Sequence, residues 1–181
     1  MSDLPTSIPE LVLTNPVPDR DARFALSWFE GTSGRDTLLK MGNAPSEILE
    51  STLEGELATL QEFIALEEEG KQKTWMLRYG ETTIGAAWID LIENHGVKAP
   101  SLHLMIGDPY FRGKGVGKAV MTTMIGYLKK NGDDTIYSRH LVSNEVVIGL
   151  NRSLGFVSDG QSYVDENELE WQNVKLSPSS K

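Results

Sequence analysis

The chain has 181 residues, a length that suits one globular domain, and its 39% hydrophobic and 8% aromatic residues suffice for an ordinary packed core. It contains no cysteine, which excludes disulfides, thiolate metal sites and a cysteine nucleophile. The formal net charge of -9 argues against a nucleic-acid binder, because such proteins need a basic face to displace counterions from phosphates, and it favours cationic substrates.

The first residues, MSDLPTSIPELVLTNP, lack the basic and apolar regions of a secretion signal. No later window approaches the apolar length that crosses a bilayer. We therefore expect a cytoplasmic protein whose partners include neither membranes nor nucleic acid.

The N-terminal part of the chain is predicted to be mainly helical. Residues 19–41 are typical of one or two short helices, with Gly31 and Gly34 as the dividing positions. A longer helix is predicted over 51–70, because leucines recur at helical spacing and Ser51 stands three residues before a glutamate, as in a capping box.

The rest of the chain combines strands with two helices. Strand-like runs at 74–80, 82–92 and 101–107 predict an antiparallel meander. They are followed by a helix at 116–130, a strand at 135–142, a helix at 144–154, and strands within 156–164 and 168–176. This order indicates a mixed α/β (α+β) fold with a mostly antiparallel central sheet flanked by helices. We expect a single domain over 1–181, with its core at about 11–176 and a disordered tail at 177–181.

The segment DPYFRGKGVGKAV, residues 108–120, is a cationic glycine turn at the junction of a predicted strand and a predicted helix. Free N–H groups and the positive end of the helix dipole favour an anion there, and glycines let the backbone approach phosphate oxygens. The spacing is one residue short of a Walker P-loop, Ala119 follows Lys118 where Ser or Thr is required, and the dinucleotide fingerprint is also absent. The turn is thus either a phosphate site of another type or a solvated turn with surface lysines.

Two motifs resemble those of the GNAT superfamily of acetyl-CoA-dependent N-acetyltransferases. Arg112, Gly115 and Gly117 in RGKGVG match its cofactor motif, and NEVVIGLNRSLGF resembles its second motif, an Asn that opens a helix ending in Gly-Phe. The resemblance covers roughly residues 11–176. Within the family, the chain is similar to the branch of ribosomal-protein and aminoglycoside acetyltransferases.

The resemblance implies an enzyme that moves an acetyl group from the cosubstrate acetyl-CoA directly to a primary amine. The amine belongs to a small molecule or a peptide N-terminus, and the sequence leaves its identity open, together with the choice between monomer and homodimer. The alternative is a non-catalytic acyl-CoA-binding or regulatory module on the same fold.

The resemblance also assigns cofactor-binding residues. In this family the strand before the glycine turn and the strand after its helix part, so the backbones of Met105, Ile106 and Gly107 would pair with the pantetheine arm. The residues expected to hold the pyrophosphate are Arg112, Gly113, Lys114, Gly115, Val116, Gly117 and Lys118. Asn144 would contact the pantetheine or serve as a plain helix N-cap, and the two roles are compatible.

The family often uses a Tyr seven residues after the helix-opening Asn as its proton donor, and this sequence has Asn151 there. An amide can donate a hydrogen bond to sulfur but has no usable acidic proton, so Asn151 is expected to orient the thioester or stabilise a thiolate. Tyr137 and Tyr163 are alternative donors.

His103 is the candidate general base, because several relatives place a carboxylate at this position, on a strand face shared with Ser101. The alternative is a hydrogen-bonded core histidine. His140 lies on the partner strand near the expected gap, and its alternative role is again packing. Asp90 and Glu93, which end their strand, are candidate ligands of a cationic amine or solvated charges. No metal site is predicted.

Overall fold

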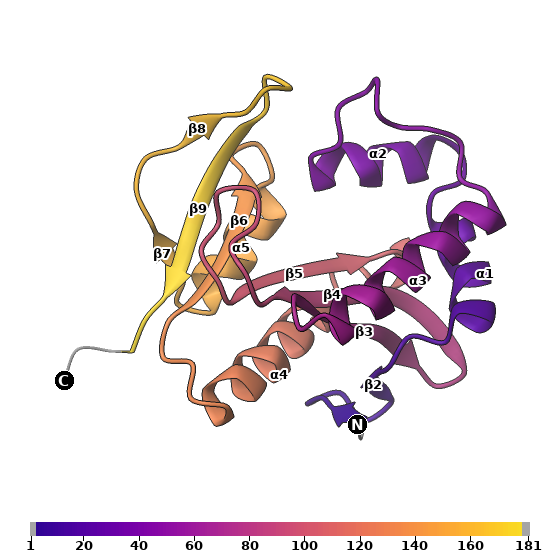
Figure 1. Cartoon of the computed structure of the whole chain (residues 1–181), viewed down its shortest axis with the longest axis horizontal. Helices are drawn as coiled ribbons and strands as arrows, with labels where there is room; N and C mark the ends of the chain where they lie inside the picture. Colours follow the sequence, from indigo (N-terminus) through magenta and orange to yellow (C-terminus); the bar gives the residue numbers. More distant parts are fainter. Residues whose placement is uncertain (1–2, 179–181) are drawn as a thin grey trace.

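The computed structural model describes residues 3–178, so residues 179–181 of the predicted tail lie outside the described residues. Within that range one open sheet has the strand order β1-β2-β3-β4-β5-β6-β9-β7, with β8 paired to β9 (Figure 1). The strands are β1 (Leu4–Pro5), β2 (Leu11–Thr14), β3 (Gln72–Tyr79), β4 (Thr82–Asp90), β5 (Ser101–Ile106), β6 (Ile136–Leu141), β7 (Val157–Ser158), β8 (Tyr163–Val164) and β9 (Glu170–Leu176). Adjacent strands are antiparallel except β5 and β6, which are parallel, so the predicted fold class is confirmed.

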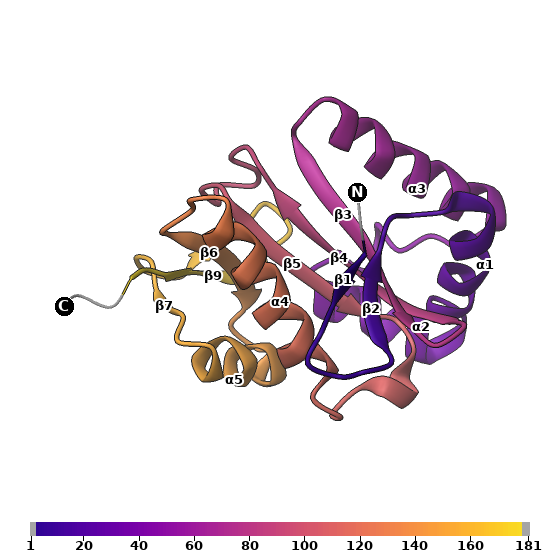
Figure 2. The ribbon, with the colours of Figure 1, turned by 90° about the horizontal axis from the view of Figure 1, so that it is seen from below.

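The helices cover both faces of this sheet (Figures 1 and 2). They are α1 (Pro18–Trp28), α2 (Gly31–Met41), α3 (Leu53–Glu68), α4 (Val116–Lys130) and α5 (Glu145–Ser153), with a short 3-10 turn at Pro109–Phe111. The helix α1 and the helix α3 pack on one face, and α4 packs on the other, where it forms the crossover between β5 and β6. No helix among the described residues has the length and apolar character that a membrane crossing requires.

Period-two alternation along the strands supplies a separate core to each face. On β3, Leu77 packs into the α4 cluster, whereas its neighbour Met76 packs against α1 and α3. The α4 stripe that includes Val120 and Met124 is fully buried. Each large apolar side chain buried in this way stabilises the fold by about 1.5–3 kcal/mol.

The division of the first two helices follows one of the two predicted glycines. Gly31 begins α2 with φ +63, a left-handed conformation that glycine adopts at little cost. Gly34 lies one turn inside α2, where an added Cβ would be 2.1 Å from the carbonyl carbon of Phe29. Gly34 therefore permits close packing of α2 on the end of α1 and does not separate the helices.

The predicted capping box at the start of α3 is wrong by one residue. Thr52 is the N-cap, and its Oγ1 accepts a hydrogen bond from the N–H of Gly55 at 3.1 Å. Ser51 instead donates its hydroxyl to the carboxylate of Glu56. Both residues satisfy polar groups at the helix start, so the helix itself was placed correctly.

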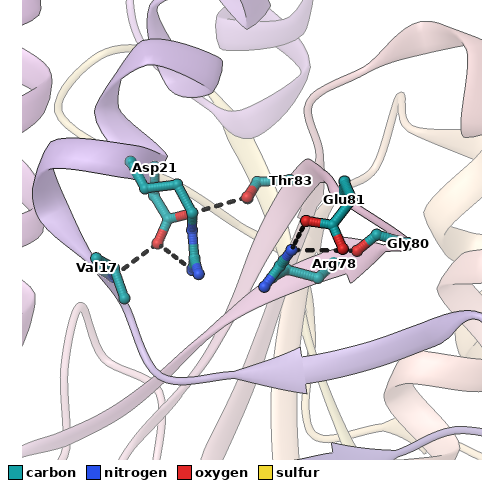
Figure 3. Close-up of polar contacts among 7 residues, drawn as sticks. Val17, Asp21, Arg78, Gly80, Glu81 and Thr83 are labelled. Carbon is teal, nitrogen blue, oxygen red and sulfur yellow. Dashed lines mark hydrogen bonds and ion pairs between the residues drawn. The ribbon is translucent and has the colours of Figure 1, made fainter.

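A buried carboxylate fixes α1 to the sheet (Figure 3). Asp21 is fully buried and accepts hydrogen bonds from the N–H of Val17 at 2.7 Å and from the hydroxyl of Thr83 on β4 at 2.8 Å. The guanidinium of Arg20 adds a two-pronged contact at 2.7 and 2.9 Å. These four donors offset the cost of removing the charge from water, and they set the position of α1 relative to β4.

Candidate active site

The two parallel strands at the centre of the sheet separate soon after they meet. They share one register pair, Ser101 with Tyr137, and the hydroxyl of Ser138 then donates to the carbonyl of Leu102 at 2.8 Å. Beyond this point β6 and β9 turn away from β5 (Figure 1). The edge of β5 from Leu104 onward therefore has no partner strand among the described residues, and a gap opens between β5 and β6.

Alternation along β5 decides which peptide groups face this gap. Met105 is the register partner of Ala86 on β4, and its carbonyl lies against Gly85. Because peptide groups in an antiparallel pair alternate between the two sides of a strand, those of Leu104 and Ile106 face away from β4, toward the gap. Among the backbones predicted to bind pantetheine, Ile106 thus faces the gap and Met105 faces β4.

Arg112, predicted to bind pyrophosphate, holds the end of β5 instead of facing solvent. Its Nε donates to the carbonyl of Ile106 at 2.9 Å, and its Nη2 donates to the carbonyl of Gly107 at 2.9 Å and to Oγ1 of Thr37 at 3.0 Å. Gly107 in turn packs on the ring of Trp28, which an added Cβ would meet at 2.1 Å. Arg112 therefore ties β5 to α2 directly ahead of the glycine turn.

The glycine turn leaves the start of α4 open. Gly113 has φ +71 and Gly115 has φ +81, and Gly115 is the N-cap of α4 with no side-chain cap. The first N–H groups of α4 therefore have no capping side chain, which is the arrangement that binds anions at helix N-termini. In the first turn, Gly117 lies where an added Cβ would be 3.4 Å from both Leu104 on β5 and Leu150 on α5.

Two lysines accompany this helix start. Lys114 places its Nζ 3.1 Å from the ring centroid of Tyr110, and Lys118 is exposed. Both line a shallow cavity of about 320 Å³ beside Gly115. Val116 is buried in the core and so anchors the turn.

The α2 segment links the two halves of the sheet across the gap. Asn144 is the N-cap of α5, because its Oδ1 accepts from the N–H of Val147 at 3.3 Å, and its Nδ2 donates to the carbonyl of Lys40 in α2 at 3.2 Å. Just after α2, Gly42 packs so closely on the ring of Trp171 in β9 that an added Cβ would lie 2.2 Å from it. Asn144 thus positions α5 and joins it to α2.

His103 forms a hydrogen-bonded cluster on the face that carries α1 and α3. Its Nε2 lies 3.1 Å from Oδ2 of Asp90 and 3.2 Å from Oγ of Ser101, and its side chain is 20% exposed. The ring stacks on Trp88 with centroids 5.1 Å apart, and Trp88 stacks on Phe63 of α3. The carboxylate favours a proton on Nε2, which leaves Nδ1 as the acceptor.

Asp90 is ionised, and its carboxylate is hydrogen-bonded within this cluster. Burial raises the pKa of its carboxyl, but the hydrogen bond and charge of His103, with a hydrogen bond from Asn94, hold the pKa below its usual value. Its predicted partner in amine binding, Glu93, lies exposed in the loop between β4 and β5. The two acids are therefore in different environments, and Asp90 lies against His103.

A second imidazole, that of His140, lies on β6, the other strand that borders the gap. Nδ2 of Asn151 on α5 is 3.1 Å from Nδ1 of His140 on β6, and both residues are buried. His140 lies on the same face of β6 as Ile136, which packs in the α4 cluster, so it faces α5. The sequence places His140 near the expected gap, with packing as the alternative, but does not predict its pairing with Asn151. Tyr163, an alternative donor, makes its hydroxyl contacts with Arg139 and Asn173.

Comparison with known proteins finds a family model that matches this chain and solved structures that share its fold. The acetyltransferase (GNAT) family model matches residues 41–156. No sequence among the curated proteins matches the chain. The fold is similar to that of RimL, a ribosomal-protein alpha-N-acetyltransferase in complex with coenzyme A (15% identity, TM-score 0.78, 97% of this chain and 98% of that chain covered).

Two further solved structures share the fold. One is spermidine N-acetyltransferase from Vibrio cholerae in complex with CoA and spermine (15% identity, TM-score 0.70, 94% of this chain and 96% of that chain covered). The other is Mycobacterium smegmatis RimJ in complex with CoA-disulfide (12% identity, TM-score 0.75, 98% and 86% covered). Because the family match spans more than half of the sequence, this chain belongs to the acetyltransferase (GNAT) family.

Proposed function

We propose that this chain is an N-acetyltransferase that transfers the acetyl group of acetyl-CoA directly to a primary amine. The observation that carries the proposal is the gap between β5 and β6, which opens beside the uncapped, glycine-rich start of α4. Family membership and the CoA found with several structural neighbours support it.

The residues around the gap fit acetyl-CoA as a cosubstrate. The peptide group of Leu104 and the N–H of Ile106 face the gap and can pair with the amides of a pantetheine arm, as a missing strand would, while the carbonyl of Ile106 accepts from Arg112. Gly117 leaves space between β5 and α5 that a larger side chain would fill. The N–H groups at 113–118, together with Lys118, suit a pyrophosphate. In this assignment Arg112 shapes the site by holding β5 and does not bind the phosphates.

The amine approaches from the α1–α3 face, because the candidate base lies there. With Nε2 held by Asp90, His103 offers the lone pair of Nδ1 to an amine proton. The amine nitrogen then attacks the thioester carbonyl, which a peptide N–H of the parted strand polarises. The C–N bond forms, the C–S bond breaks with its electron pair on sulfur, and no covalent enzyme intermediate is needed.

An amine panel tests this function. Thiol release from acetyl-CoA is followed with spermine, an aminoglycoside, small metabolite amines and peptides with free N-termini, and an N-acetylated peptide serves as the control. We expect amine-dependent thiol release with at least one class and the matching acetylated product by mass spectrometry. Acetyl-CoA binding without any amine-dependent release would favour the non-catalytic module, and absence of binding would contradict the proposal as a whole.

A further inference from the structure

The pair formed by His140 and Asn151 has a defined proton arrangement. The two residues, His140 and Asn151, are 8% and 2% exposed, and the amide nitrogen of Asn151 lies 3.1 Å from Nδ1 of His140. An amide nitrogen can only donate, so Nδ1 accepts and the single proton of the neutral ring sits on Nε2. Asn151 therefore fixes the tautomer of His140.

The surroundings keep this imidazole neutral. Burial lowers the pKa of His140, and the positive charge of Arg152 on α5 lowers it further. Among the described residues no carboxylate is paired with the ring, in contrast to His103. At neutral pH His140 is thus a hydrogen-bond donor through Nε2–H and does not carry a charge.

Polar atoms of this pair lack partners. Oδ1 of Asn151 is buried without a hydrogen bond, and Nε2 of His140 has no hydrogen-bond partner within residues 3–178. Nearly all buried polar groups in native proteins are satisfied, since an unmade bond costs free energy. The acceptor of Asn151 is therefore buried and unsatisfied, whereas Nε2–H of His140 is not fully buried and is open to a ligand.

The position of the pair indicates which part of the ligand this is. His140 lies on β6 two residues beyond Ser138, whose hydroxyl donates to the carbonyl of Leu102 on β5, and thus where β6 borders the gap. It faces α5, whereas His103 lies on the opposite face of the sheet. If the amine and its base act from the His103 face of the sheet, the thioester in the gap turns its other side, with the sulfur, toward the face that carries His140.

We propose that His140 donates Nε2–H to the departing sulfur of acetyl-CoA, and that Asn151 is the positioning residue that holds the ring in this tautomer. The inference rests on the proposed function. As the C–S bond breaks, its electron pair goes to sulfur, and the donated hydrogen bond stabilises the thiolate. His103 takes the proton of the amine, water returns a proton to the sulfur, and His140 keeps its own proton.

The thiol pKa of bound CoA tests this step without turnover. Because the chain has no cysteine, alkylation by iodoacetamide as a function of pH reports on the CoA thiol alone. A donor to the thiolate lowers the thiol pKa, and we expect a fall of about one unit or more from free CoA to the wild-type complex. The shift should disappear in His140→Leu and shrink in Asn151→Leu, whereas His140→Gln, which restores a donor, should keep part of it. His95→Ala, which removes an exposed imidazole, should keep all of it.

Calorimetric CoA binding and melting temperature are measured for each variant. If wild-type protein does not bind CoA, the proposed function fails. If CoA binds but its thiol pKa equals that of free CoA, or if the folded His140→Leu variant keeps the full shift, the role of His140 is overturned while the proposed function stands. Should His140→Leu fail to fold, an undiminished shift in both Asn151→Leu and His140→Gln would overturn it equally.

Discussion

The two strands that border the gap, β5 and β6, each form one arm of it and carry a histidine. The hydrogen-bond partners of these histidines differ. On β5, His103 is partly exposed and pairs through Nε2 with the carboxylate of Asp90. On β6, His140 is buried and pairs through Nδ1 with the amide of Asn151. Asp90 holds Nε2 of His103 and leaves its Nδ1 as an acceptor, whereas burial lowers the pKa of His140 and the amide of Asn151 occupies its Nδ1. The same side chain is therefore suited to accept a proton on one arm and to donate a hydrogen bond on the other.

The topology of the sheet produces this difference. The hairpin partner of β5 is β4, whose last residue, Asp90, is the register partner of Ser101 and so lies beside His103. The face of β6 that carries His140 is covered by α5, which delivers Asn151. Each histidine takes its partner from the element next in space.

The largest expected effect comes from closing the gap that separates the arms. In Gly117→Val the added methyl groups occupy the space between Leu104 and Leu150, so we expect CoA binding to be lost in a folded protein. Gly126→Val on the same helix is the matched control, because the space around Gly126 is open. Calorimetry and the ligand-induced rise in melting temperature measure the effect. If folded Gly117→Val bound CoA with wild-type affinity, the gap would not be part of the cofactor site.

Removal of the candidate base should distinguish the role of His103 from that of His140. We expect His103→Ala to lower kcat by about a hundredfold or more, the usual contribution of a general base, while CoA affinity and the thiol pKa of bound CoA stay unchanged. Rates are measured with an amine identified in the panel. A full rate in His103→Ala would assign the base elsewhere.

Replacement of Asp90 should have a smaller effect. Asp90→Asn keeps the shape but removes the charge that orients His103, and we expect about a tenfold loss in kcat with little change in KM. Because the folded-state pKa of Asp90 lies below its usual 3.8, its stabilising contribution is complete above about pH 3.8 and is lost as the pH falls through the lower folded value. The difference in melting temperature between wild type and variant should therefore disappear in strong acid. A difference that grows on acidification would contradict the pairing.

The smallest effect is expected at the surface of the phosphate site. Lys118→Ala should weaken CoA by about threefold, because an exposed ion pair is worth up to about 1 kcal/mol. The loss should shrink with added salt and be absent for a pantetheine fragment that lacks the pyrophosphate. Titrations of both ligands at two salt concentrations measure it, and equal losses for both ligands would assign Lys118 a different role.

The sequence predicted the elements well because their signals are local. The turn at 113–117 and the helix that follows it are encoded by glycines and an apolar stripe, and the structure has them as predicted. Asp90 and His103 were both named as candidates, but their contact depends on the β4–β5 register across a loop, which no local pattern encodes. The pairing of His140 with Asn151 depends on how α5 packs on β6, and the contacts of Arg112 with the carbonyls of Ile106 and Gly107 depend on the path of the chain after β5, so no local pattern predicts either.

Amide hydrogen exchange with and without CoA tests the central claim, that the gap between β5 and β6 receives the cosubstrate. The N–H groups of Leu104 and Ile106 face the gap, whereas that of Met105 faces β4. We expect CoA to slow exchange at Leu104, Ile106 and 113–118, and to leave Met105 nearly unchanged. Binding of CoA with no added protection at Leu104 and Ile106 would show that the cosubstrate lies elsewhere and would contradict the account.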